Sequence, residues 1–238
     1  MIPVYYDLHI HSALSPCADN DMTPNDIVGM AMLNGLDMIA VTDHNSMANA
    51  GSVMKAAEGK GLIVLPGAEI ETSEEVHVLC LFGSLKEALS FEADVSPHFS
   101  PLQNRTDIYG SQLLLDKNDN VMGELDRMLL ASSTISFSDL QIMTMKHGGA
   151  FIPAHIDRDS MSVISNLGFL PPDMNIPVVE VSPRGVERGF IENNRRLFPG
   201  SRVITSSDAH HLWAIAERTN YLMLPGMTAE AAIKALSL

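Results

Sequence analysis

Apolar residues in this chain fall into short runs that alternate with longer amphipathic or polar stretches. Short apolar runs bounded by turn-forming residues predict buried β-strands, and amphipathic stretches with capping residues predict helices. Strands are predicted at residues 4–11, 37–42, 62–65, 76–82, 150–154, 178–181, 202–205 and 220–224. Helices are predicted at residues 24–34, 47–60, 84–93, 124–131, 138–147 and 229–238, with Thr23, Ser46, Ser138 and Thr228 as candidate N-caps. This alternation predicts a parallel α/β sheet or barrel.

Residues 94–123 interrupt the alternation. This segment contains Pro97, Pro101, Gly110 and the charged turn DKNDN, which favour loops over regular elements. The segment is too short to hold a hydrophobic core of its own. We therefore interpret it as an excursion from a single domain that covers residues 1–238.

The chain has 238 residues, of which 46% are hydrophobic, and a formal net charge of -14. This length and hydrophobic content suit one α/β barrel. The acidic balance disfavours binding along a nucleic-acid backbone. It is compatible with a small phosphorylated substrate or a nucleic-acid end, because bound dications reverse the local charge. Two cysteines, no basic N-terminal leader and no long uncharged apolar run favour a cytoplasmic location without membrane contact, and no feature indicates an oligomeric state.

Two histidines stand two positions apart near the end of the first predicted strand. Side chains of a strand alternate between its faces, so His9 and His11 point the same way, as two ligands of one cation would. Further ligand-type residues stand at or near the ends of other predicted strands, namely His44, Glu69, His77, His155, Asp208 and His210. In α/β barrels the C-terminal ends of the strands meet at one face, which carries the active site. The set therefore predicts a metal centre at that face.

The same residues lie in motifs that resemble a known family. In order along the chain, DLHIHS, AVTDHN, PGAEIET, the strand with His77, PAHID and SSDAHH resemble the polymerase-and-histidinol-phosphatase (PHP) family of metal-dependent phosphoesterases. The resemblance extends over nearly the whole chain and is weakest in residues 94–123. It implies a distorted seven-stranded (β/α) barrel, which is TIM-like in outline.

The resemblance also implies a site for three divalent metal ions. The first ion would be held by His9, His11, Glu69 and Asp208, and the second by Glu69, His77 and His155, with Glu69 bridging. The third would be held by Asp19, His44 and His210. The family usually has SDG where this chain has ADN, so Asp21 is a competing choice to Asp19.

The mixture of imidazole and carboxylate ligands suits zinc, manganese or iron better than magnesium alone. A water shared by two such ions ionises near neutral pH and provides a metal-activated hydroxide as nucleophile. Asp43 and Glu180 are candidates to orient ligand imidazoles, although Asp43 also suits a helix cap and Glu180 a buried acid with a local partner. Arg158 and Arg184 are candidates to bind a phosphate. The alternative for Arg158 is a surface ion pair with Asp157 or Asp159.

These residues predict a cytoplasmic metal-dependent phosphoesterase, a hydrolase of a small phosphorylated substrate. A phosphomonoester is the preferred substrate, which makes the protein a phosphatase. The first alternative is a phosphodiesterase or nuclease that acts on nucleotides or nucleic-acid ends. Amidohydrolases, which also open with HxH, usually bridge their metals with a lysine, whereas this chain offers Glu69. A non-catalytic metal-binding module is the remaining alternative.

Overall fold

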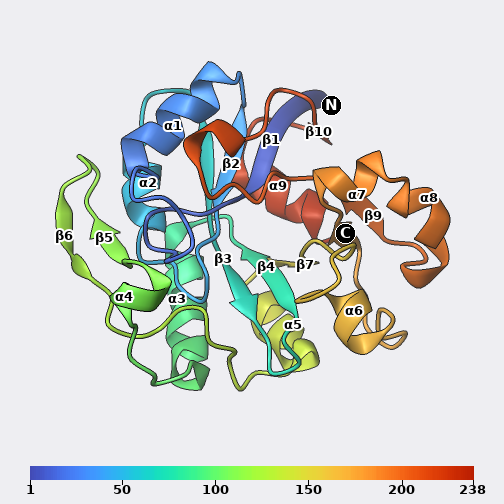
Figure 1. Ribbon diagram of the computed structural model, residues 1–238. Helices are drawn as coiled ribbons and strands as arrows, with labels where there is room; N and C mark the ends of the chain where they lie inside the picture. The colour runs from blue at the N-terminus through green and yellow to red at the C-terminus, as the bar shows by residue number, and fades with distance from the viewer.

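The computed structural model describes residues 1–238, which form an α/β fold around one curled six-stranded sheet (Figure 1). The strand order is β10-β1-β2-β3-β4-β7. These strands are β1 (Ile2–Ile10), β2 (Met38–Val41), β3 (Ile63–Glu71), β4 (His77–Leu81), β7 (Ala150–Pro153) and β10 (Tyr221–Leu224). β1, β2 and β3 pair in parallel, whereas β10, β4 and β7 pair antiparallel to their neighbours.

The parallel part of the sheet follows from its connections. α1 (Pro24–Leu33) links β1 to β2, and α2 (Ala50–Ala56) links β2 to β3. Parallel strands need such crossover helices, and the helices bury both faces of the strands they cover. All four residues of β2 are buried accordingly. The predicted parallel arrangement is confirmed for this part of the chain.

β4 departs from the parallel prediction. β3 continues beyond the predicted strand end at Leu65 as far as Glu71, so Glu69 lies inside a strand. Only five residues separate Glu71 from His77, the first residue of β4. A connection this short permits a hairpin but not a crossover, so β4 runs antiparallel to β3.

Two further strands, β8 (Val178–Glu180) and β9 (Arg202–Ile204), pair in parallel outside the six-stranded sheet. Backbone hydrogen bonds connect this pair to both sides of the main sheet. The Ile156 N–H donates to the Glu180 carbonyl at 2.9 Å, and the His11 N–H donates to the Ala209 carbonyl at 2.9 Å. The sheet curls toward closure in this way, while closure into one seven-stranded barrel stays a prediction.

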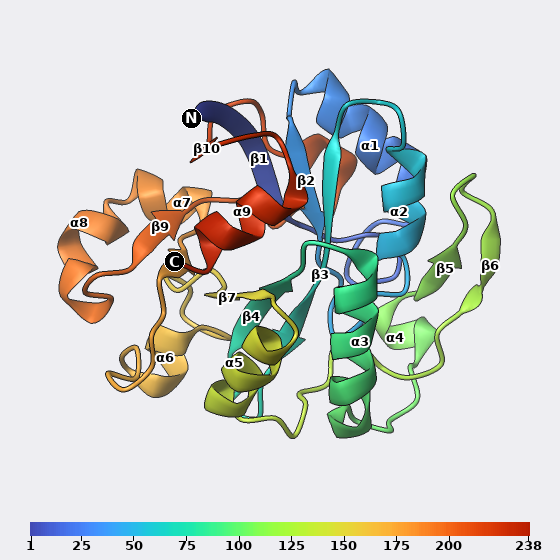
Figure 2. The same ribbon diagram turned by 180° about the vertical axis from the view of Figure 1, so that it is seen from behind.

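Three longer helices complete the outer layer (Figure 2): α3 (Leu85–Val95), α5 (Phe137–Lys146) and α9 (Ala229–Leu236). The N-cap of α5 is Ser136, which accepts a hydrogen bond from the Asp139 N–H, so the prediction of Ser138 was wrong by two residues. The prediction that Ser46 caps α2 was also wrong, because the Ser46 hydroxyl donates to Glu92 and the helix begins at Ala50. Thr228 caps α9 as predicted.

The excursion forms a small unit at the outer side of α2 and α3. It contains η1 (Ser96–His98), α4 (Thr106–Tyr109) and the hairpin β5 (Leu113–Leu115) with β6 (Val121–Glu124), which stands apart from the main sheet (Figure 1). The predicted helix at 124–131 is absent. The Gln112 side chain donates to the carbonyls of Leu125 and Arg127 and accepts from the Leu129 N–H, which holds this segment extended.

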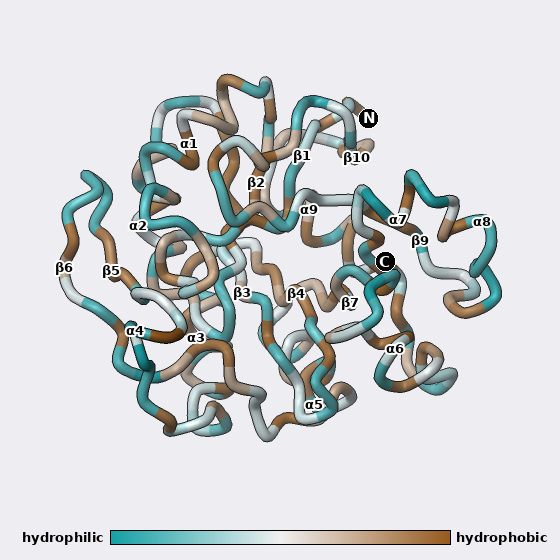
Figure 3. The backbone as a smooth tube through the Cα atoms, in the orientation of Figure 1, coloured by the Kyte–Doolittle hydropathy of each residue, from teal (hydrophilic) through white to brown (hydrophobic).

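The remaining elements are short: α6 (Val163–Leu167), α7 (Pro183–Glu187), α8 (Phe190–Asn194), η2 (Arg195–Leu197) and η3 (Leu212–Ala214). The α7–α8 segment is largely hydrophilic, in contrast to the strands of the sheet (Figure 3). None of the helices combines the length and the apolar composition needed to cross a membrane.

Candidate metal centre

The predicted ligands come from six parts of the fold and meet at one place. They lie on β1, on the segments after β2, β7 and β9, near the end of β3 and at the start of β4. The residues brought together are His9, His11, His44, Glu69, His77, His155, Asp208 and His210. Apart from His210, each of them is buried or nearly so. Their donor atoms form three overlapping groups: His9, His11, Glu69 and Asp208; His44, Glu69 and His77; and His11, His44 and His210.

Glu69 occupies the middle of this cluster. Its Oε1 lies 2.9 Å from His77 Nδ1, 3.0 Å from His155 Nε2 and 3.4 Å from His9 Nε2. Its Oε2 lies 3.1 Å from His44 Nδ1 and 3.4 Å from His11 Nε2. Five imidazoles therefore surround one carboxylate that is 1% exposed. This is the arrangement that a bridging ligand requires.

Asp208 closes the group around the two histidines of β1. Its Oδ1 lies 3.2 Å from His9 Nε2 and 3.1 Å from His11 Nε2, and these two nitrogens are 3.2 Å apart. Asp208 has a φ of 55°, a left-handed conformation that is uncommon outside glycine. This backbone turn places the carboxylate beside the two imidazoles.

Hydrogen bonds on the far side of the imidazoles fix which nitrogen faces the cluster. His9 Nδ1 donates to Glu180 Oε2 at 2.9 Å, and His210 Nδ1 donates to the Asp208 carbonyl at 2.9 Å. His11 Nδ1 donates to Ser15 Oγ at 3.0 Å, because that hydroxyl gives its own proton to Asp43. These contacts favour a proton on Nδ1 of each ring, and Nε2 is then the nitrogen that a metal ion would use.

Asp43 is connected to the cluster indirectly, through the Ser15 hydroxyl. Its carboxylate accepts from the Ser12 N–H, the Ser12 hydroxyl and the Ser15 hydroxyl at 2.7, 2.7 and 2.8 Å. It therefore holds His11 through Ser15 and does not contact the ring of His44. Ser15 was not among the predicted site residues, and the one sequence signal for its contact with His11 is its place four residues later.

Replacing Ser15 by alanine is expected to weaken metal binding by roughly 10–100-fold, as loss of an orienting partner commonly does. The variant removes the acceptor of the His11 Nδ1 proton and one donor to Asp43. Metal titration of the metal-free protein by calorimetry measures this effect. Ser138→Ala, an exposed serine on α5, is the matched control. Equal affinities of the two variants would contradict the orienting role of Ser15.

The charges of the cluster are unequal. Burial acts against charge on every member, but the surrounding imidazoles hold the pKa of Glu69 well below its usual value, and His9 and His11 lower that of Asp208. Glu69 outweighs burial at His77 and raises its pKa to about 9. Burial lowers the pKa of His44 well below its usual value and lowers that of His210 to about 4. Ionised carboxylates, a protonated His77 and the neutral imidazoles of His44 and His210 thus coexist in one buried cluster.

This donor set fits divalent metal ions. His9 Nε2 and His11 Nε2 lie 3.2 Å apart, and His11 Nε2 lies 3.1 Å from Asp208 Oδ1, so two imidazole nitrogens and a carboxylate oxygen converge. His155 Nδ1 and Glu180 Oε1 are buried and have no hydrogen-bond partner. Buried lone pairs that converge in this way are stabilised by a cation.

Asp19 and His155 are the predicted ligands that belong to none of the three groups, but His155 Nε2 lies 3.0 Å from Glu69 Oε1, whereas Asp19 lies apart. Its side chain is 53% exposed and accepts a hydrogen bond from His211 Nδ1 at 2.6 Å. Its backbone N–H donates to the His210 carbonyl at 2.9 Å, which keeps the loop beside the cluster. The competing choice, Asp21, is also exposed and belongs to no group. A ligand role for Asp19 stays a prediction.

The two predicted phosphate-binding arginines lie on one side of the cluster. Arg158 donates to Asp208 Oδ2, the oxygen that faces away from His9 and His11. It pairs with neither Asp157 nor Asp159, the alternatives that its neighbours in sequence suggested. Arg184 belongs to α7 and forms no ion pair, so its guanidinium is available.

Comparison with protein families identifies the N-terminal part of the chain. The family model described as "PHP domain" matches residues 7–145. This range holds the β1 histidines, His44, Glu69 and His77. The ligands after β7 and β9 lie beyond it and are contributed by the rest of the fold.

Two curated relatives match a shorter segment. A 5'-3' exoribonuclease of Haemophilus influenzae is 33% identical over 79 residues, which is 32% of this chain and 28% of the relative. A 3',5'-nucleoside bisphosphate phosphatase of Chromobacterium violaceum is 30% identical over 77 residues, 32% of this chain and 26% of the relative. The matched segments therefore span only about a quarter of these relatives.

Solved structures match over the whole chain. A lesion-specific endonuclease from Pyrococcus furiosus superimposes with a TM-score of 0.68, covering 99% of this chain and 56% of that chain at 19% identity. At this identity the match establishes the shared fold.

Proposed function

Because the chain belongs to the PHP domain family, we propose that it is a metal-dependent phosphoesterase whose substrate is a small phosphomonoester. The observation that carries this proposal is the enclosure of Glu69 by five imidazoles, each with a ring nitrogen within 3.4 Å of a Glu69 oxygen. A mixed imidazole and carboxylate shell suits zinc, manganese or iron. Every lysine of the chain is exposed, which argues against the lysine-bridged centre of an amidohydrolase.

Three divalent ions are proposed, with Glu69 shared between the first two. His9, His11, Glu69 and Asp208 would hold the first ion; Glu69, His77 and His155 the second; and Asp19, His44 and His210 the third. Bound divalent ions would supply the activated water and the positive charge that phosphoester hydrolysis needs. In this assignment Glu180, Ser15, Arg158 and Arg184 are not metal ligands.

The protein's own residues position that chemistry. Glu180 retains the His9 proton on Nδ1, and Asp43 with Ser15 retains the His11 proton on Nδ1, so both rings present Nε2. Arg158 is placed beside Asp208 to donate to a phosphoryl oxygen. Burial of the cluster keeps bulk water away from these groups, which strengthens each electrostatic contact.

A second candidate function is a nuclease that acts on nucleic-acid ends. It is favoured by the names of two matches, an exoribonuclease and a lesion-specific endonuclease. The net charge of -14 and the absence of a basic stripe favour a small substrate instead. A phosphomonoester therefore remains the preferred proposal.

We expect one manganese- or zinc-supplied preparation to hydrolyse p-nitrophenyl phosphate faster than bis-p-nitrophenyl phosphate. Both activities should disappear with a chelator and return when the metal is restored. Initial rates at matched substrate concentrations measure the preference. Faster turnover of the diester would favour the nuclease, and absence of both activities in protein with measured metal would contradict the phosphoesterase proposal.

A further inference from the structure

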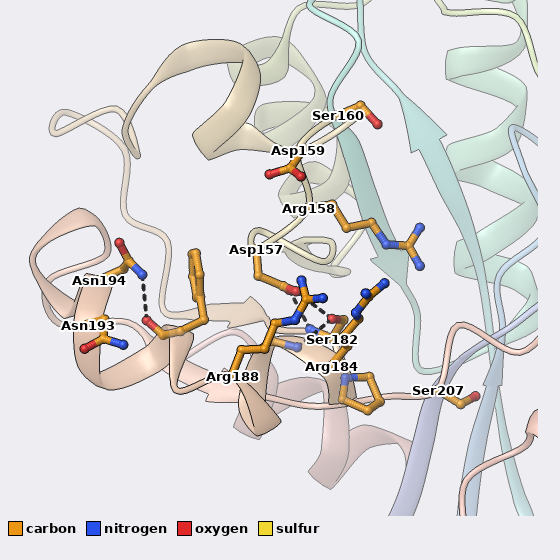
Figure 4. A pocket seen from close by; sticks show the side chains of 13 residues that line it. Asp157, Arg158, Asp159, Ser160, Ser182, Arg184, Arg188, Asn193, Asn194 and Ser207 are labelled. Carbon is orange, nitrogen blue, oxygen red and sulfur yellow. Dashed lines mark hydrogen bonds between the residues drawn. The ribbon is translucent and has the colours of Figure 1, made fainter.

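A polar cavity of about 690 Å³ lies beside the metal centre (Figure 4). Its wall is formed by the residues after His155, by α7 and α8, and by Ser207, which directly precedes Asp208. Small-molecule sites have volumes of roughly 300–1,000 Å³. The cavity is therefore large enough for a substrate of nucleotide size next to the metal ligands.

Three arginines line this cavity: Arg158, Arg184 and Arg188. Arg184 is the second residue of α7, and Arg188 is its C-cap. Their four-residue spacing places both side chains on one face of the helix. Figure 4 shows both side chains extending from α7 toward the part of the cavity where Arg158 lies. Neither Arg184 nor Arg188 forms an ion pair or a side-chain hydrogen bond. Two unpaired like charges at this spacing repel each other unless an anion lies between them.

The acidic residues of the cavity do not neutralise these arginines. Asp157 is occupied, because its Oδ1 accepts from the Ser182 N–H at 2.7 Å and its Oδ2 from the Ser182 hydroxyl at 2.6 Å. Gly185 makes this possible, since a Cβ there would lie 2.4 Å from Asp157 Oδ2. Asp159 is exposed at the wall and forms no ion pair. Two arginines without an ion pair therefore share one cavity wall with Arg158, in a chain with 15 basic and 29 acidic residues.

We propose that the cavity is a second phosphate subsite, so that the substrate carries two phosphate groups. One phosphate would lie at the metal centre beside Arg158, and the other would be bound by Arg184 and Arg188. A guanidinium donates two parallel hydrogen bonds to phosphate oxygens, and two arginines from one helix face suit a dianion. The proposal rests on the proposed phosphoesterase function, because it names the class of substrate for that same centre.

The subsite is tested first by binding, without turnover. Metal-free protein is titrated calorimetrically with adenosine 3',5'-bisphosphate, comparing Arg184→Gln/Arg188→Gln with the matched control Arg196→Gln, an exposed arginine outside the cavity. Loss of charged hydrogen bonds predicts an affinity roughly 10-fold or more weaker for the double variant than for the control. Affinities within twofold of each other would overturn the proposal. Far-UV circular dichroism confirms that both variants are folded.

Turnover by the metal-supplied protein then separates the two proposals. The ratio of kcat/KM for the bisphosphate to that for p-nitrophenyl phosphate is expected to fall about 10-fold or more in the double variant. An unchanged ratio would overturn the subsite while leaving the phosphoesterase intact. Arginine-dependent binding in a protein that hydrolyses neither compound would support the subsite and contradict the proposed function.

A third substrate identifies the source of the second phosphate. In a 5'-phosphorylated dinucleotide the second phosphate is a diester of the nucleic-acid backbone. A preference for the dinucleotide that depends on Arg184 and Arg188 would support the subsite and assign it to a nucleic-acid end. A preference for the bisphosphate with the same dependence would support the subsite and assign it to a small molecule.

Discussion

Replacing Glu69 by glutamine is expected to abolish tight metal binding and to remove phosphoesterase activity. Glutamine keeps the shape of the side chain but removes the one negative charge that five imidazoles share. The loss should exceed the roughly 10–100-fold caused by removing an orienting neighbour, because Glu69 is proposed to bind two metals directly. Metal content by mass spectrometry and kcat/KM for p-nitrophenyl phosphate measure the two effects.

The control for this variant is Glu75→Gln, which makes the same chemical change at an exposed position after β3. Removing the anion from among buried imidazoles also destabilises the fold, by about 3–5 kcal/mol for a broken buried pair, so folding is checked by circular dichroism. A folded Glu69→Gln protein that retains its metals and its turnover would exclude Glu69 as the bridging ligand.

Replacing Gly67 by alanine is expected to destabilise the protein and disturb the metal centre together. Gly67 pairs with Leu81 in the β3–β4 hairpin, two residues before Glu69. A Cβ at this position would lie 2.7 Å from the Leu81 side chain and 2.8 Å from the Cys80 carbonyl. Since the carbonyl cannot rotate away, the strands must separate, at a cost of about 1–3 kcal/mol. Urea denaturation and metal titration measure the two consequences.

Gly29→Ala is the matched control because it adds the same methyl group without a contact. Nothing lies within 4 Å of a Cβ at Gly29, which is in the interior of α1. Alanine there should stabilise the helix by roughly 0.5–1 kcal/mol. If both variants shifted the denaturation midpoint in the same direction, the contact between β3 and β4 would not be the cause.

Most of the candidate centre could be predicted because its ligands follow strand signals. The β1 histidines alternate with apolar residues, His155 comes directly after a short apolar run, and Asp208 follows β9 after three hydroxyl residues. Such positions converge in any curled α/β sheet, so residue type and place along the chain suffice. Asp19 lies in an irregular loop, where no strand positions its side chain. Its carboxylate is accordingly not part of the cluster.

Other features depend on contacts between distant residues. The path of 125–131 is set by Gln112, whose amide replaces helical hydrogen bonds, and no periodicity in the local sequence signals this. In the sequence, nothing distinguishes Arg188 from an ordinary exposed residue. Its place in the cavity wall follows from the position of α7 in the fold. The exact N-cap of a helix is also hard to predict when two serines stand close together. Ser136 caps α5 in place of the predicted Ser138.

During synthesis, the cluster of candidate metal ligands can be completed only after residues 1–210 have left the ribosome. The contact between His11 and Asp208 spans 197 residues, and β1 gains its outer neighbour only when Tyr221–Leu224 pairs with it. At roughly 5–20 residues per second, the first histidines wait about 10–40 s for their last partner. During that interval the edge of β1 is unpaired and the set of ligands is incomplete. An unpaired strand edge promotes aggregation. Chains stalled before residue 205 should therefore remain sensitive to protease, and productive folding should be timed by the arrival of the last strand.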